Sequence, residues 1–126
     1  MVQKKPEYYH HSTYPLEIRS SLIPYAGLGV FTMVKIPKDV VVDIYEGEVC
    51  RYNPVSGYYF EVREGYGIDA KEYPRCYMAM LNDCKGTKYE NNCEFVVVGD
   101  RVEVRTIREI EEGDELLISY GEEYWR

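Results

Sequence analysis

Short apolar runs bounded by turn residues predict that the chain is built mainly of β-strands. The runs cover residues 16–20, 30–34, 40–45, 58–63 and 68–70. They are rich in β-branched and aromatic residues, while glycine, proline, asparagine and aspartate gather between them. Strict alternation of apolar and polar positions is weak in these runs, which favours several small sheets over one large sheet.

The clearest local prediction is a hairpin in the second half of the chain. Two further β-type runs, residues 93–98 and 101–106, are separated only by Gly99-Asp100. A two-residue connection that contains glycine is typical of a tight hairpin turn. We therefore expect these two runs to pair with each other as antiparallel strands.

Two other stretches have a distinct expected structure. Residues 115–120 alternate like a final strand that delivers Tyr120 to a glycine turn. Residues 74–81 favour a helix, because Pro74 suits the first helical position and the methionines and alanine that follow have high helix propensity. Together with the runs above, these stretches predict one domain with about eight short strands and one short helix.

Composition and charge narrow the class of protein. The chain has 126 residues, of which 45% are hydrophobic and 29% are charged, as expected of one globular domain. No apolar run approaches the roughly 20 residues that span a bilayer, and the polar start of the chain argues against a secretory signal. The net charge of −7 without a basic stripe argues against nucleic acid as partner. It suits a lysine- or arginine-rich partner, although solubility alone also explains an acidic surface.

Cysteine, histidine and tyrosine give weaker indications. The four cysteines form no Cys-x-x-Cys pair and the two histidines are the neighbours His10 and His11, so no zinc site is expected. We expect free, buried thiols instead. The 14 tyrosines against 3 phenylalanines suggest a cleft lined by hydroxyl-bearing rings, although surface and edge-strand tyrosines explain most of the excess.

Several motifs carry candidate chemistry, but each alone has an ordinary structural explanation. Residues 27–29, Gly-Leu-Gly, lack the third glycine and the following helix of a dinucleotide-binding fingerprint. Two such glycines let a backbone approach a ligand closely, yet they also make a plain turn. Asn82, Asn91 and Asn92 equally serve to hydrogen-bond a long loop to itself, and Tyr120 serves equally as a buried tyrosine.

Taken in chain order, these motifs resemble the signatures of a SET domain. The matching segments are residues 26–31, 45–48, 68–70, 80–82 with 92–93, and 115–121. The resemblance extends from about Leu16 to Trp125. It implies a mainly β fold, the β-clip, of small curved sheets with a knot-like carboxyl-terminal region in which the last strand passes the asparagine loop. We expect residues 1–15 to be an N-terminal arm and residues 16–126 to be the SET domain.

The SET resemblance implies transfer of a methyl group from S-adenosylmethionine to a protein lysine, with histone tails as the expected substrate class. A basic, lysine-containing protein segment is the expected partner, in the nucleus or alternatively in the cytoplasm, and neither a metal nor a membrane is expected. The implied catalytic residues are Tyr120 and Tyr45, the cofactor-binding residues are Gly27, Leu28, Gly29, Asn82, Asp83, Tyr120 and Trp125, and the lysine channel contains Tyr58, Ile118 and Tyr124. The aromatic walls of such a channel are expected to favour a cationic side chain.

Two departures from the SET pattern leave a second function open. Asp83 stands where the family usually has histidine, and the loop to Asn92 is longer than in the compact form of the motif. Both changes resemble the PR subfamily of chromatin regulators, which includes members with weak or unproven methyl transfer. The alternative function is therefore a non-catalytic PR/SET-like interaction module. Ile118 lies where an aromatic residue often limits the number of methyl groups, so room for more than one methyl group is expected.

Overall fold

The structure is a computed structural model and describes residues 7–51 and 56–120. Its strands are β1 (Tyr8–Tyr9), β2 (Leu16–Ser20), β3 (Leu28–Thr32), β4 (Val41–Tyr45), β5 (Glu48–Arg51), β6 (Tyr59–Arg63), β7 (Tyr66–Asp69), β8 (Arg75–Cys76), β9 (Cys93–Val98) and β10 (Arg101–Thr106). Among the described residues the one helical element is a short 3-10 helix, η1 (Tyr77–Met80). The fold is therefore mainly β, as predicted.

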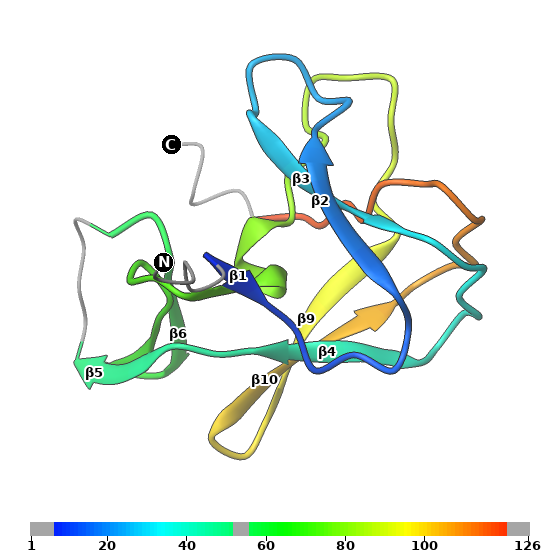
Figure 1. Ribbon diagram of the computed structural model, residues 1–126. Helices are drawn as coiled ribbons and strands as arrows, with labels where there is room; N and C mark the ends of the chain where they lie inside the picture. The colour runs from blue at the N-terminus through cyan, green and yellow to red at the C-terminus, as the bar shows by residue number, and fades with distance from the viewer. Residues whose placement is uncertain (1–6, 52–55, 121–126) are drawn as a thin grey trace, which may run out of the picture.

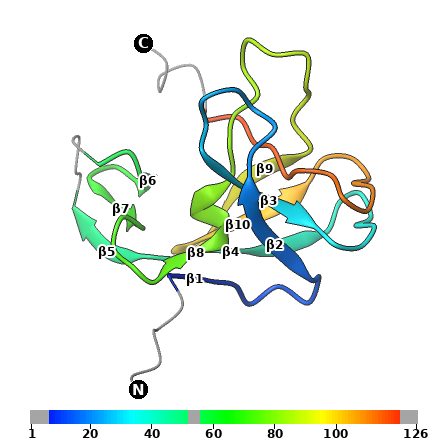
Figure 2. The same ribbon diagram turned by 45° about the horizontal axis from the view of Figure 1, so that its top comes forward.

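The described strands form four small sheets, in agreement with the weak alternation of the sequence (Figure 1). β2 pairs with β3, and β1 pairs in parallel with β8. The two three-stranded sheets have the orders β4-β10-β9 and β5-β7-β6, with antiparallel pairing throughout. The green segment that contains η1 lies between the β5-β7-β6 sheet and the β2-β3 sheet in both views (Figures 1 and 2).

β9 and β10 form the predicted hairpin. Their register runs from Cys93 opposite Thr106 to Val98 opposite Arg101, and Gly99-Asp100 connects the two strands. Gly99 has a φ of +62°, a left-handed conformation that glycine adopts without strain and that two-residue hairpin turns favour. β10 pairs with β4 on its other side, so the hairpin becomes part of a three-stranded sheet.

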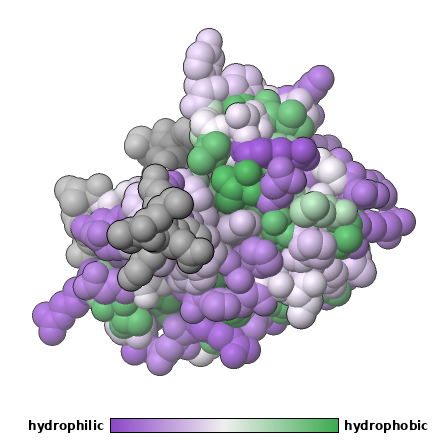
Figure 3. Space-filling view, in the orientation of Figure 1, coloured by the Kyte–Doolittle hydropathy of each residue, from purple (hydrophilic) through white to green (hydrophobic). Residues whose placement is uncertain are grey.

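One hydrophobic core joins residues from all four sheets. Its members with 0% exposure are Val30, Ile36, Val102, Val104, Ile110, Leu116 and Ile118. These side chains come from segments far apart in the sequence, and their removal from water is the main force that holds the small sheets together. The face seen in Figure 3 is mostly hydrophilic, with smaller hydrophobic areas between the polar residues.

The helix predicted for residues 74–81 is wrong for half of its length. Arg75 and Cys76 form the short strand β8, which pairs with β1. Cys76 is extended, with a φ of −67° and a ψ of 147°, and only Tyr77–Met80 turn as a 3-10 helix. The reason is a long-range pairing, because β1 offers backbone partners to β8 and tertiary contacts routinely outweigh helix propensity.

The final strand predicted for residues 115–120 is a buried segment that forms isolated bridges instead of a ladder. Leu116, Leu117 and Ile118 are all buried, so the segment has no polar face of the kind that alternation would give. The backbone groups of its buried residues find partners in β3 and in the two flanks of the asparagine loop. The predicted alternation therefore fails at its centre.

The same segment passes between the two flanks of the asparagine loop and gives the fold its knot-like character (Figures 1 and 2). On one side the Ile118 N–H donates to the Asn82 carbonyl at 3.0 Å. On the other side the N–H groups of Asn92 and Cys93 both donate to the Leu117 carbonyl, each at 3.0 Å. The residues before and after the loop thus hold the end of the described chain between them.

The described part of the chain lacks two classes of feature. No helix within it is long and apolar enough to cross a membrane. Within the same residues no group of three or more His, Cys, Asp and Glu side chains is arranged to hold a metal ion. The cysteines are free thiols, of which Cys50 is half-buried and Cys76, Cys84 and Cys93 are buried.

Candidate active site

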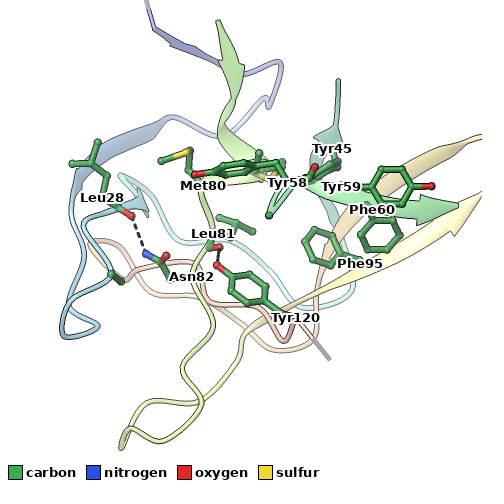
Figure 4. Close-up of a pocket in the computed structure, with 14 residues that line it drawn as sticks. Leu28, Tyr45, Tyr58, Tyr59, Phe60, Met80, Leu81, Asn82, Phe95 and Tyr120 are labelled. Atoms are coloured by element: carbon green, nitrogen blue, oxygen red, sulfur yellow. Dashed lines mark hydrogen bonds between the residues drawn. The ribbon is translucent and has the colours of Figure 1, made fainter. Parts of the chain in front are cut away.

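A cleft of about 340 Å³ lies beside η1, where several distant segments meet (Figure 4). Its volume falls within the roughly 300–1,000 Å³ of pockets that hold small-molecule ligands. The polar and aromatic residues that define it are Tyr45, Tyr58, Tyr59, Phe60, Asn82, Phe95 and Tyr120. None of the described lining residues carries a charged side chain.

Tyr120 reaches the cleft from the end of the knot-like segment and is fixed at two points. Its hydroxyl donates to the Leu81 carbonyl at 2.6 Å, and its backbone N–H donates to Asp83 Oδ2 at 2.8 Å. Figure 4 shows its ring directed toward Leu81, on the same side of the cleft as Asn82. A hydroxyl that donates one hydrogen bond keeps acceptor capacity on its oxygen.

Asp83 does not line the cleft but holds the backbone of the residue that does. Its side chain is buried, and its second oxygen, Oδ1, accepts from the Lys85 N–H at 2.8 Å. The two backbone N–H groups stabilise the buried charge of the carboxylate, and the carboxylate in turn gives both N–H groups a hydrogen-bond acceptor. The aspartate thus ties the asparagine loop to Tyr120.

Asn82 points its amide group between two acceptors. Nδ2 donates to the Leu28 carbonyl at 2.9 Å and to Glu115 Oε2 at 3.3 Å. Because both neighbours can only accept, the NH₂ group must face them, and the amide oxygen is turned the other way. The Asn82 side chain is therefore held in one orientation at the edge of the cleft.

Glu115 is a buried carboxylate that sequence reasoning assigned to the final strand without a role. It is 3% exposed, and it accepts hydrogen bonds from Ser21 Oγ at 2.7 Å and from the Leu22 N–H at 2.8 Å, besides the Asn82 contact. Its charge is thus compensated by donors from the loop before β3. No local pattern in the sequence signals this contact, since a glutamate at the start of an apolar run is ordinarily exposed.

Asn82, Asp83, Glu115 and Tyr120 all fall within a region that one protein family matches. The family model of the SET domain matches residues 27–121. The chain belongs to the SET domain family. No curated protein matches the chain. SET domains are generally protein-lysine methyltransferases that use S-adenosylmethionine.

Tyr45 and Tyr58 form a connected wall of this SET domain's cleft. The Tyr45 hydroxyl donates to the Tyr58 carbonyl in a short hydrogen bond. Tyr45 is 5% exposed, and burial raises the pKa of its hydroxyl well above the ordinary value. The hydroxyl therefore stays protonated at every physiological pH and acts here as a donor, not as a base.

The cleft suits the methyl donor that SET domains use. It combines aromatic and aliphatic walls with a few oriented polar groups, namely the Asn82 amide, the Tyr120 hydroxyl and nearby backbone carbonyls. Pockets for small organic ligands commonly have this composition. We expect Asn82 and the backbone near Leu28 to hold the donor, which supplies a methyl group on a positively charged sulfur.

The structure brings together five of the residues predicted for the site. Leu28, Tyr45, Tyr58, Asn82 and Tyr120 line the cleft. The other predicted residues that the structure describes do not line it: Gly27, Gly29, Asp83 and Ile118. Tyr124 and Trp125 lie outside the described residues.

The predicted residues outside the lining have identifiable positions. Ile118 has 0% exposure and belongs to the core, and Gly27 has a φ of +75° with its carbonyl accepting from the Ser21 N–H at 2.8 Å. Sequence reasoning missed Phe60 and Phe95 as cleft residues. They sit on strands of different sheets, so no local motif connects them.

Gly29 yields a prediction about packing. A Cβ added there would lie 2.3 Å from Glu115 Oε2 and 3.2 Å from Asn82 Nδ2. We expect Gly29→Ala to lower the free energy of unfolding by about 1–3 kcal/mol, because the buried carboxylate has to move. Urea unfolding followed by circular dichroism measures this change.

Gly57→Ala is the matched control for this substitution. Gly57 adjoins the cleft, and a Cβ there meets no atom within 4 Å. Its substitution should change the free energy of unfolding by less than about 0.5 kcal/mol. Equal stability of the two variants would show that Glu115 is not tightly packed against Gly29.

Proposed function

We propose that this SET domain transfers a methyl group from S-adenosylmethionine to a lysine of a basic protein segment, with histone tails as the substrate class. The observation that carries the proposal is the meeting of Tyr120 and Asn82 in one cleft with uncharged lining. The family match supports the reaction class. The net charge of −7 supports a basic partner, since opposite charge speeds encounter. A nuclear location follows from a histone substrate.

The chemistry requires a neutral lysine amine. The ordinary pKa of lysine is near 10.4, so the amine is protonated in water and has no lone pair to attack a methyl group. A cleft whose described lining has no carboxylate gives an ammonium ion no charge partner, and this favours the neutral form. The uncharged walls of the cleft thus favour the deprotonated lysine amine, which is the form that can attack the methyl group.

Tyr120 then orients the amine. Its hydroxyl is fixed on the Leu81 carbonyl at 2.6 Å, so its oxygen offers an acceptor at a defined place. The Leu81 carbonyl is a second acceptor next to it. An amine that has lost its proton to water and bonds its N–H groups to these oxygens would keep its lone pair free. It could then form the N–C bond as the S–C bond of the donor breaks and S-adenosylhomocysteine leaves. Correct positioning of this kind supplies much of the rate enhancement in bimolecular transfers.

We further propose that residues 16–126 form the catalytic domain and that residues 1–15 form an arm docked on it. The described part of the arm supports this division. β1 pairs with β8, and the N–H groups of His11 and Ser12 donate to Asp43 Oδ2 at 2.9 and 3.1 Å. The arm therefore lies against the strand that leads into η1, which contributes to the cleft.

The alternative, a non-catalytic interaction module, was suggested by Asp83 in place of histidine. The hydrogen bond from the Tyr120 N–H to Asp83 favours the enzymatic function. Asp83, although it stands in place of histidine, still holds the backbone of the active-site tyrosine. Calorimetry with S-adenosylhomocysteine separates the two functions. The enzyme is expected to bind it with a micromolar dissociation constant and to label core histones from methyl-labelled cofactor, whereas the module would show millimolar binding at best.

Asn82→Ala and Asn91→Ala are the variant and control for this experiment. Both asparagines belong to the same loop, but only Asn82 lines the cleft. We expect Asn82→Ala to weaken cofactor binding at least about tenfold. The reason is the loss of one hydrogen bond to the cofactor, since about 1.4 kcal/mol corresponds to a tenfold change in the dissociation constant. Asn91→Ala should bind like the unmodified chain. Equal weakening by both variants would count against a cofactor at Asn82.

A further inference from the structure

Arg75 is a buried cation that forms no ion pair within the described part of the chain. It is 7% exposed, and the ion pairs of the described residues do not include it. Its guanidinium donates to three oxygens instead: Ala70 O at 3.0 Å, Tyr73 Oη at 3.1 Å and Lys71 O. The buried carboxylate of Asp69 accepts from Ser56 Oγ at 2.8 Å and from the Lys71 N–H at 3.1 Å. The positive charge of Arg75 is therefore retained inside the protein.

The guanidinium lies between two tyrosine rings. Its carbon is 3.8 Å from the centre of the Tyr58 ring and 4.3 Å from that of Tyr73. Arg75 does not line the cleft, but Tyr58 does, and so does Met80, whose Sδ lies 3.9 Å from Arg75 Nη1. The charge therefore lies directly behind these two wall residues. An aromatic face attracts cations through its electron density. Since one face of Tyr58 already holds a cation, its other face attracts a second cation less.

The other aromatic walls are also engaged with one another. The Tyr45 and Phe95 rings meet at 5.7 Å and 89°, and the Phe60 and Phe95 rings meet at 4.9 Å and 62°. In such edge-to-face contacts one ring covers part of the face of the next. Figure 4 shows these rings grouped on the side of the cleft away from Asn82. The described walls thus differ from an open aromatic cage for a cation.

We propose that Arg75 is a positioning residue that acts through Tyr58 to make the Tyr58 wall of the cleft, away from Asn82 where the methyl donor is expected, select a neutral amine over a charged one. The proposal rests on the proposed function, because it takes the cleft to receive a lysine side chain. Two positive charges on opposite faces of one ring repel each other, and little water lies between them to screen the repulsion. Arg75 thus opposes the general expectation that aromatic channel walls favour a cation.

Two small probes of equal shape test this selection. Choline carries a permanent positive charge, and dimethylbutanol is its uncharged carbon analogue. Binding of each to the full chain is followed by the NMR methyl signal of Met80, which lines the cleft, with the 52% exposed Met33 as internal reference. We expect Arg75→Met to raise the affinity for choline relative to dimethylbutanol about fivefold. A merely structural role of Arg75 would change both affinities alike.

Arg75→Lys and Arg63→Met are the controls. Lysine keeps the charge, so the ratio of the two affinities should stay near that of the unmodified chain. Arg63 also covers a tyrosine ring, that of Tyr66 at 4.2 Å, but neither residue lines the cleft, and the ratio should again stay unchanged. An Arg75→Met ratio within twofold of the unmodified chain, or an equal change in Arg75→Lys, would overturn the proposal.

The unmodified chain provides a second test, which does not depend on whether a substituted protein folds. We expect it to bind dimethylbutanol at least as tightly as choline. A tenfold preference for choline, or no shift of the Met80 signal with either probe, would overturn the proposal as well. These titrations need no methyl transfer, so their outcome is separate from the labelling of histones that tests the proposed function.

Discussion

Replacing Tyr120 by phenylalanine is expected to lower kcat for methyl transfer by about 100-fold. The substitution removes the oxygen that is fixed on the Leu81 carbonyl at 2.6 Å, and with it the acceptor that orients the amine. The backbone contact from the Tyr120 N–H to Asp83 is untouched. The free energy of unfolding should therefore fall by only about 1 kcal/mol, the usual loss for one hydrogen bond.

Initial rates with labelled cofactor and saturating histone measure the effect of Tyr120→Phe. Tyr66→Phe is the matched control, because Tyr66 lies in β7, stacks against Arg63 and does not line the cleft. It should keep the rate of the unmodified chain. If Tyr120→Phe retained full activity, the orienting role of the hydroxyl would be excluded even though the fold and family remain.

The second large effect is expected at Asn92, on stability. Its buried amide donates to the Glu115 carbonyl at 2.9 Å and accepts from the Leu117 N–H at 2.8 Å. Asn92→Ala would leave both backbone groups buried without these partners. We expect it to lower the free energy of unfolding by about 2–4 kcal/mol, since each unsatisfied buried group costs about 1–3 kcal/mol.

Chemical denaturation monitored by fluorescence gives this value, with Asn91→Ala as control. Asn91 is the neighbouring residue, but within residues 7–51 and 56–120 its amide oxygen accepts from no donor except the Cys84 thiol, a weak one, at 2.9 Å. Its substitution should cost less than about 1 kcal/mol. Similar losses for the two variants would mean that Asn92 does not fasten the segment that passes between the loop flanks.

Local chemistry explains why part of the fold was predictable. The hairpin of β9 and β10 depends on its own two-residue turn and on the β-type residues beside it, so the sequence contains all that decides it. The residues 74–81 show the opposite case. Their helix propensity is real, but Arg75 and Cys76 pair with β1, and that pairing depends on a segment far away in the chain.

The candidate site likewise contains residues that could be predicted from the sequence and residues that could not. Tyr120 and Asn82 were predicted because the resemblance to a family carries long-range information that composition and periodicity lack. Phe95 and Arg75 were missed, since the first is one apolar residue in a strand and the second is one charge among many. Glu115 was missed for a similar reason, because only the folded chain brings Ser21 and Asn82 to its carboxylate.

The passage of Leu116–Ile118 between the two flanks of the asparagine loop has a consequence for biosynthesis. A nascent chain that has left the ribosome up to residue 114 holds Asn82 and Asn92 but not the segment that bonds to both of them. Chains emerge at roughly 5–20 residues per second, and partly completed domains expose apolar surface meanwhile. The cleft therefore cannot be completed before residues 115–120 have left the ribosome, although Asn82 and Asn92 are already present.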